Sequence, residues 1–93
     1  MTADLSAMLA EIKAAAQARN DLAAQLVARA GGLRLHRQDG RKAAVTPELD
    51  GSSHWRITYI DARGPSGHTC HNDKLAAVSD ALRSGYRPEG ARA

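Results

Sequence analysis

The chain has 93 residues and three aromatic side chains, and much of its hydrophobic fraction is alanine. We therefore expect residues 1–93 to form one domain with a small core. Such a core gives modest stability, and a homodimer along a helix is a natural supplement. The single cysteine excludes an intramolecular disulfide, and there is no apolar run of signal-peptide or membrane length. The sequence predicts a cytoplasmic protein without a membrane partner.

Positive charge is concentrated in the middle of the chain. The formal net charge is +3, and the segment 34–42 carries four cations against the single carboxylate of Asp39. These cations are Arg34, Arg37, Arg41 and Lys42. A basic patch binds nucleic acid or an acidic protein surface, and its alternative is an ordinary solvated face.

The first thirty residues predict a long helix. Apolar residues recur at i, i+3, i+4 and i+7 from Leu5 to Ile12, and the pattern resumes at Leu22 after an alanine-rich stretch. Two glycines then end the helix. Asn20 and Asp21 mark a possible break, so the sequence leaves its continuity open. An unbroken helix would be about 40 Å long, and its overhang could pack against a second copy or a partner.

Four strand signals follow the helix. Residues 33–37 alternate between apolar and polar, and an Asp-Gly hairpin signal leads to a weak strand over 43–46. A second Asp-Gly precedes the strongest strand, 54–61, and after a turn over 62–67 a short edge strand is expected over 68–71.

A short second helix closes the predicted fold. Asn72 is its expected N-cap, and Gly85 is expected to end it. Its apolar stripe consists of Leu75, Val78 and Leu82. The tail over 87–93 is expected to be disordered. The order α-β-β-β-β-α predicts an α+β fold, with a three- or four-stranded antiparallel meander covered on one face by the helices.

The stretch from Asp61 to His71, DARGPSGHTCH, concentrates residue types that active sites use. Its glycines lead into a strand rather than a helix N-terminus, unlike those of a phosphate-binding loop. His68 and Cys70 would share a strand face with His54 nearby, but structural zinc takes four ligands. A catalytic cysteine needs a base and a cleft, and so small a domain offers a poor one. We predict a hairpin, no cofactor and no enzymatic activity, with metal binding at these residues as the alternative.

The predicted binding surface is the face of the sheet opposite the helices. If Trp55, Ile57 and Tyr59 face the helices, their neighbours along the strand face outward. The predicted partner-binding residues are Arg34, His36, Arg37, Arg41, Lys42, His54 and Arg56. Sheets that read RNA place aromatic residues on this open face. An inward orientation of the aromatics argues against that mode of binding.

The segment 55–85 resembles a short unit that recurs in proteins of plasmids and phages. In that unit, a strand ending in an aromatic residue and Asp leads through Gly-Pro-x-Gly-His to a short strand and an alanine-rich helix. The matching residues are Tyr59, Asp61, Gly64, Pro65, Gly67 and His68. In length and type, the chain is also similar to phage-encoded inhibitors such as anti-CRISPR proteins. The resemblance implies a non-catalytic protein of a mobile genetic element that masks a surface on a host macromolecular complex, for instance a CRISPR-Cas effector.

The order of elements is also similar to that of the double-stranded RNA-binding domain. That family begins its last helix with a cluster of lysines, where this chain has only Lys74. This difference argues against membership of that family. The basic patch, together with Lys74 and Arg83, still leaves a small basic nucleic-acid-binding domain as the alternative function. Salt dependence separates the two, because phosphate contacts weaken steeply with ionic strength.

Overall fold

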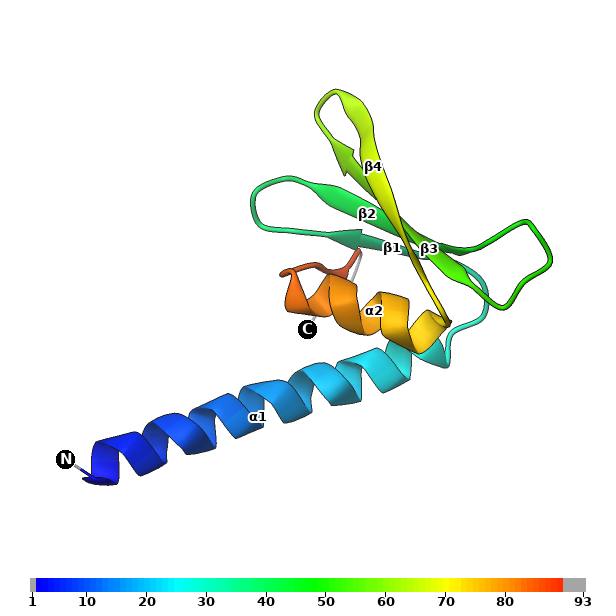
Figure 1. The fold of residues 1–93 in the computed structure, drawn as a ribbon. Helices are drawn as coiled ribbons and strands as arrows, with labels where there is room; N and C mark the ends of the chain where they lie inside the picture. Colours follow the sequence, from blue (N-terminus) through cyan, green and yellow to red (C-terminus); the bar gives the residue numbers. More distant parts are fainter. Residues whose placement is uncertain (1, 90–93) are drawn as a thin grey trace.

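In the computed structural model, which describes residues 2–89, two helices and five strands follow one another along the chain. Their bounds are α1 Thr2–Val27, β1 Leu33–His36, β2 Lys42–Pro47, β3 Trp55–Asp61, β4 Gly64–His71, α2 Lys74–Arg83 and β5 Arg87–Pro88. The predicted α+β fold with a long first helix, an antiparallel sheet and a short second helix is confirmed (Figure 1).

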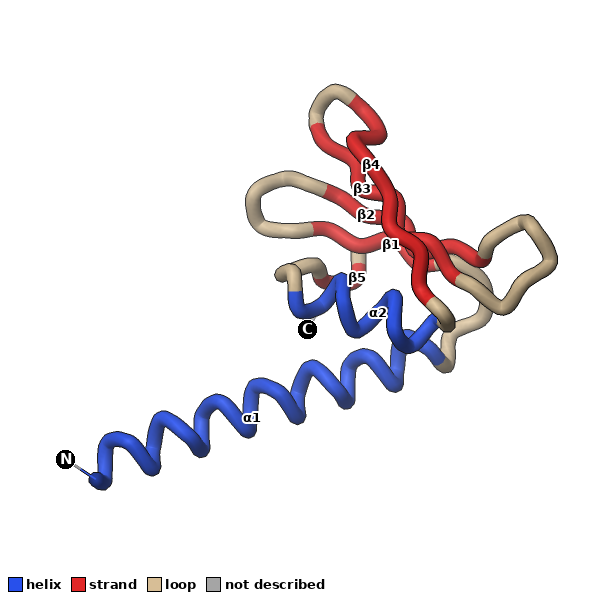
Figure 2. The backbone as a smooth tube through the Cα atoms, viewed as in Figure 1, coloured by secondary structure: helices blue, strands red, loops and turns tan. Residues whose placement is uncertain are grey.

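The elements are stacked in three layers. The strands form one antiparallel sheet in the order β4-β3-β2-β1-β5 (Figure 2). Helix α2 packs on one face of this sheet, against β2, β3 and β4. Helix α1 packs mainly on α2, on the side away from the sheet (Figure 1). No described helix covers the opposite face of the sheet, and none is long and apolar enough to cross a membrane.

The core lies between the sheet and α2, with a contribution from α1. Burial alternates along β1 and β2, as the period-two pattern of a half-buried strand requires. The largest fully buried side chains are Leu26, Leu35, Ile57, Leu82, Val45 and Val78. Trp55 and Tyr59 pack against the edge of this core, so the predicted inward face of β3 is confirmed.

Helix α1 is continuous through Asn20 and Asp21. The amide of Gln17 donates a hydrogen bond of 2.8 Å to the Asp21 carboxylate one turn later, which supports the helix at the suspected break. The helix ends at Val27, three residues before the predicted end. Only its C-terminal half is covered, and the rest projects as an arm beyond α2 (Figure 1).

Two details of the predicted second helix are wrong. Its N-cap is Asp73 rather than Asn72, and the Asp73 carboxylate accepts a hydrogen bond of 2.8 Å from the backbone N–H of Ala76. Leu75, expected in the apolar stripe, is 50% exposed. The buried residues of α2 are Ala77, Val78, Ala81 and Leu82. Alanines take the contact positions because α2 lies between two layers, and small side chains let both approach.

The strand boundaries also differ from the prediction. Residues 87–88 were expected in a disordered tail but form β5, in which Pro88 pairs with Leu35 and the Glu89 N–H donates to the Arg34 carbonyl at 2.9 Å. Residues 90–93 of that predicted tail lie outside the described residues. Strand β4 begins at Gly64, four residues before the predicted start, because a bulge beside Tyr59 keeps the β3–β4 pair in register as far as the turn. The sheet therefore has five strands.

Candidate functional site

The uncovered face of the sheet carries outward side chains in rows that run across the strands, because directly paired residues of antiparallel strands share a face. The middle row consists of Arg34, Ala44, Thr58 and His68. The flanking rows consist of Thr46, Arg56 and Cys70 on one side, and of His36, Lys42 and Ile60 on the other. We call these ten residues the open face. It brings together four of the seven predicted binding residues: Arg34, His36, Lys42 and Arg56.

Most of the positive charge on the open face is paired. The Arg56 guanidinium donates to both carboxylate oxygens of Glu48, at 2.6 and 3.2 Å. This hydrogen bonding raises the pKa of Arg56. The Cys70 thiol lies 3.8 Å from the same carboxylate, whose side chain is only 12% exposed. Arg56 is therefore a braced part of the sheet rather than a freely mobile cation.

Lys42, the first residue of β2, is paired as well: its Nζ lies 3.4 Å from the carboxylate of Glu89, the residue after β5. Arg34 makes no ion pair within the described part of the chain and is exposed. The three cations Arg34, Lys42 and Arg56 are thus accompanied by two carboxylates. A hollow of about 250 Å³ is lined by Arg34, Lys42 and the apolar Ile60. The open face is close to neutral and mixed in character, less basic than the sequence predicts.

His54, another predicted binding residue, is exposed in the loop just before β3 rather than within the strand. Its N–H donates to the Ser52 hydroxyl at 3.2 Å, and its carbonyl accepts a hydrogen bond of 3.0 Å from the Glu48 N–H. These bonds hold the His54 backbone close to the Glu48 end of the open face.

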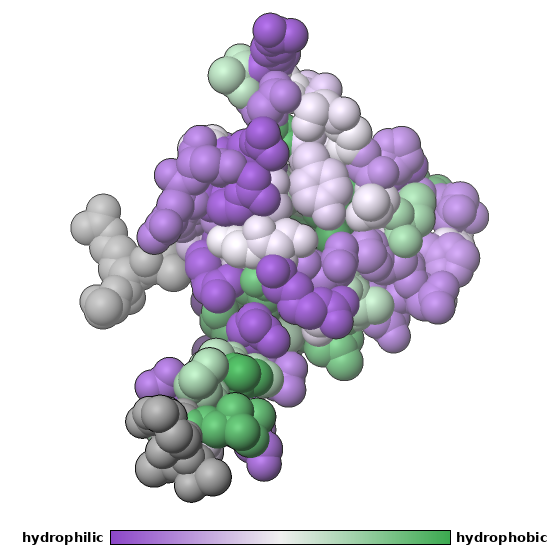
Figure 3. All heavy atoms as spheres, turned by 60° about the vertical axis from the view of Figure 1, so that its left-hand side comes forward, coloured by the Kyte–Doolittle hydropathy of each residue, from purple (hydrophilic) through white to green (hydrophobic). Residues whose placement is uncertain are grey.

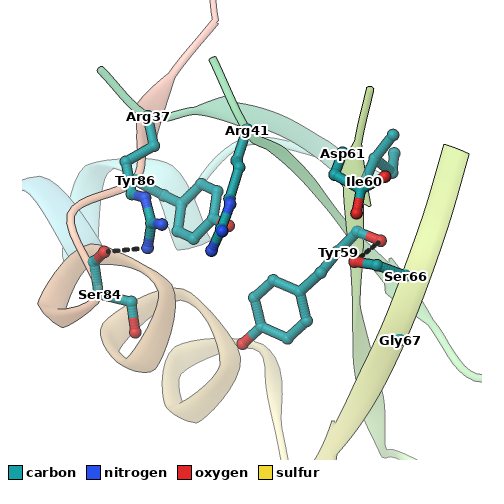
Figure 4. Close-up of a pocket in the computed structure, with 9 residues that line it drawn as sticks. All are labelled: Arg37, Arg41, Tyr59, Ile60, Asp61, Ser66, Gly67, Ser84 and Tyr86. Atoms are coloured by element: carbon teal, nitrogen blue, oxygen red, sulfur yellow. Dashed lines mark hydrogen bonds between the residues drawn. The ribbon is translucent and has the colours of Figure 1, made fainter. Parts of the chain in front are cut away.

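The structure separates Arg37 and Arg41 from the open face. The Arg37 guanidinium lies 5.2 Å from the centroid of the Tyr86 ring and donates a hydrogen bond of 3.3 Å to the Ser84 carbonyl (Figure 4). It also donates a hydrogen bond of 2.6 Å to the Asp39 carboxylate. The pKa of Asp39 is lowered to about 2, and the largest cause of this shift is the hydrogen bond from Arg37. The same bond raises the pKa of Arg37. Arg37 thus joins the β1–β2 turn to the end of α2.

A polar pocket of about 460 Å³ opens beside this brace (Figure 4). Its lining residues are Arg37, Arg41, Tyr59, Ile60, Asp61, Ser66, Gly67, Ser84 and Tyr86. The Tyr59 and Tyr86 rings pack with their centroids 5.9 Å apart, and Arg41 lies 3.6 Å from the Asp39 carboxylate that also holds Arg37. The sequence gives no signal for this pocket, because its wall comes from the β1–β2 turn, β3, β4 and the end of α2.

The residues with metal-binding chemistry are spread over two faces. His68 and Cys70 share one strand face as predicted, and pairing with Thr58 and Arg56 places that face on the open side of the sheet. His71 is paired with the inward Trp55. His71 instead lies 2.9 Å from the Thr69 hydroxyl and 3.8 Å from Asp80. Over residues 2–89, no three His, Cys, Asp or Glu side chains lie close enough together to hold a metal ion.

Lys74, which the nucleic-acid alternative required, is engaged within the fold. Its Nζ lies 4.9 Å from the centroid of the Trp55 ring and donates a hydrogen bond to the Arg29 carbonyl. The other helix cation, Arg83, lies 3.7 Å from Asp80. Lys74 therefore links α2 to the turn that follows α1 and to the first residue of β3.

No protein-family model, curated protein or solved structure matches this chain.

Proposed function

We propose that this chain is a non-catalytic binding protein whose open face docks on the surface of another protein. The observation that carries the proposal is the composition of that uncovered face. It holds three cations, two of which pair with the neighbouring carboxylates of Glu89 and Glu48, and it also holds small and apolar side chains such as Ala44 and Ile60. Protein interfaces mix charged, polar and apolar groups in this way. A surface built for phosphates would carry a clear excess of unpaired cations.

The resemblance of residues 55–85 to a unit of plasmid and phage proteins supports the proposal that a mobile genetic element encodes this protein. Such a protein would act by occupying a surface on a host complex, and we propose a CRISPR-Cas effector as the first target to test. Its action would require no chemical step, only enough affinity to exclude nucleic acid or a second protein from the covered surface.

The experiment is a nucleic-acid cleavage assay with a panel of purified CRISPR-Cas effectors, each incubated with this protein. The test variant is Arg34→Glu/Thr58→Glu, which alters two outward residues of the middle row that make no ion pair among the described residues. The control is Ala62→Glu/Arg63→Glu in the exposed β3–β4 turn, which changes the charge by the same amount. We avoid Arg56→Glu because it would place a second carboxylate against Glu48.

We expect the wild-type and control proteins to inhibit one of the effectors. The Arg34→Glu/Thr58→Glu protein should not inhibit that effector. Equal inhibition by all three proteins would move the binding surface away from the open face. If no effector binds or is inhibited, the CRISPR-Cas assignment is wrong.

Direct binding of nucleic acid is the second candidate, because Arg34 and Arg41 are both exposed on the β1–β2 hairpin. The test is fluorescence anisotropy with short single- and double-stranded DNA and RNA at about 50 and 200 mM salt. Micromolar affinity that collapses at the higher salt would support this candidate. The near-neutral open face leads us to expect no binding at either salt.

A further inference from the structure

The arm of α1 exposes an apolar stripe with no partner in the chain. Four large apolar residues, Leu5, Met8, Leu9 and Ile12, are each between 53% and 62% exposed. Their spacing places them on one side of the helix. Figure 3 shows apolar residues, in green, gathered at the projecting end of α1 at the bottom of the view. A contiguous exposed patch of this kind on a small protein marks an interaction site.

The stripe continues the same helix face that packs within the chain. Ala23 and Leu26 follow Ile12 at helical spacing, and both are buried under α2. Counting from Leu5, Ala16 is the first residue with a partly buried side chain, and near Arg19 the helix meets the last turn of α2 at Arg83. Residues 5–15 are therefore exposed along the part of α1 that extends beyond the end of α2.

The uncovered segment has the symmetry that self-association requires. The stripe residues lie at intervals of three, one and three, so the pattern reads the same in both directions about a point between Met8 and Leu9. A twofold interface brings each surface against its own copy and so needs a self-complementary pattern.

We propose that a second copy of this chain covers the arm, in an antiparallel pair of α1 helices related by a twofold axis at residues 8 and 9. Leu5 of each copy then packs on Ile12 of the other, and Met8 packs on Leu9. Each apolar stripe is then covered along its length, and each arm runs toward the last turn of the other copy's α2. The segment between Leu5 and Ala18 carries only Glu11 and Lys13 as charges, so charge repulsion does not oppose the pairing.

The contact area fits a weak, reversible dimer. Each stripe residue leaves roughly 100 Å² exposed, so the paired arms would remove about 800 Å² from water. Stable interfaces bury about 1,200 to 2,000 Å² in total, and smaller ones belong to transient complexes. We therefore expect a dissociation constant of roughly 10 µM to 1 mM. The dimer uses a surface separate from the open face, so it stands independently of the proposed function.

Sedimentation equilibrium of the full chain from about 1 µM to 2 mM tests the proposal. The variant Met8→Glu/Leu9→Glu places carboxylates at the twofold axis and should weaken the dimer by about 100-fold or more. The control Ala10→Glu/Ala14→Glu adds the same charges on the opposite side of the same helix and should leave the dissociation constant unchanged. Far-ultraviolet circular dichroism confirms that each arm remains helical.

Disulfide trapping tests the orientation in a Cys70→Ser background. An antiparallel pair predicts a mixed disulfide when Leu5→Cys and Ile12→Cys proteins are combined, and none when either is oxidised alone. Homodisulfides from Leu5→Cys alone would instead indicate parallel helices and overturn the proposed arrangement. A folded wild-type protein that stays monomeric at about 2 mM would overturn the dimer itself, leaving the arm for a different partner or for solvent.

Discussion

Truncation of two leucines on the same face of α1 should have very different effects on stability. Leu26 is fully buried beneath α2, whereas Leu9 is 53% exposed on the arm. For Leu26→Ala we expect a loss of about 3 kcal/mol, within the range of about 2 to 5 kcal/mol for removing a buried leucine side chain. For Leu9→Ala in the monomer we expect a change within about 0.5 kcal/mol. The chemical change is the same, so burial alone accounts for the difference.

The assay is urea unfolding followed by Trp55 fluorescence at about 1 µM protein, well below the expected dissociation constant of the dimer. A loss of about 3 kcal/mol corresponds to a fall in melting temperature of roughly 12 to 24 °C for a domain of this size. Trp55 lies at the edge of the core beside Lys74, so its emission reports on docking of the helices.

Two results would refute this reasoning. A Leu9→Ala loss equal to that of Leu26→Ala at 1 µM would mean that the arm is covered within a single chain. A Leu26→Ala loss below about 1 kcal/mol would mean that α1 contributes little to the folded state. At millimolar protein the Leu9→Ala effect should grow, because the dimer then stabilises the wild-type chain.

Three further predictions concern local contacts. Asp73→Ala removes the cap of α2 and should cost about 1 kcal/mol in thermal unfolding, while Asp73→Asn should keep most of that stability. Lys74→Met keeps the apolar stem but removes the cation from the Trp55 ring; we expect a loss of about 1 kcal/mol in urea unfolding and a shift in tryptophan emission. Hydrogen bonding to Arg37 lowers the pKa of Asp39 from 3.8 to about 2, so its contribution to stability is complete above pH 4 and is lost as the pH falls through 2. Melting temperatures measured from pH 5 to 2 should therefore fall less for Asp39→Asn than for the wild type, and parallel curves would contradict this.

The faces of the strands could be predicted because alternation along a strand is a local property. Period two alone places Trp55, Ile57 and Tyr59 on one face, their apolar character favours the inward one, and the structure confirms it. Strand β5 could not be predicted, since its two residues form a strand only through pairing with β1. The cap of α2 was placed one residue early, because Asn72 and Asp73 both fit an N-cap.

The candidate site was only partly predictable, for a similar reason. Counting charges along the chain indicates a basic patch, but Glu48 and Glu89 approach Arg56 and Lys42 only after the chain has folded. The same count groups Arg37 with residues of the open face, whereas Arg37 directly follows the outward His36 and therefore lies on the helix side of the sheet, against Tyr86. The overhang of α1 was expected from its length, but where α2 stops depends on how the two helices pack.

The placement of α1 on α2, rather than on the sheet, also affects the order of folding. Each strand from β1 to β4 pairs with the next one along the chain, so the meander can form through local contacts. Leu26 must instead wait for α2, which is synthesised roughly 50 residues later. Helix α1 is therefore synthesised before the sheet but can be docked only after α2 has formed, and its apolar face stays open to chaperones and to neighbouring chains until then.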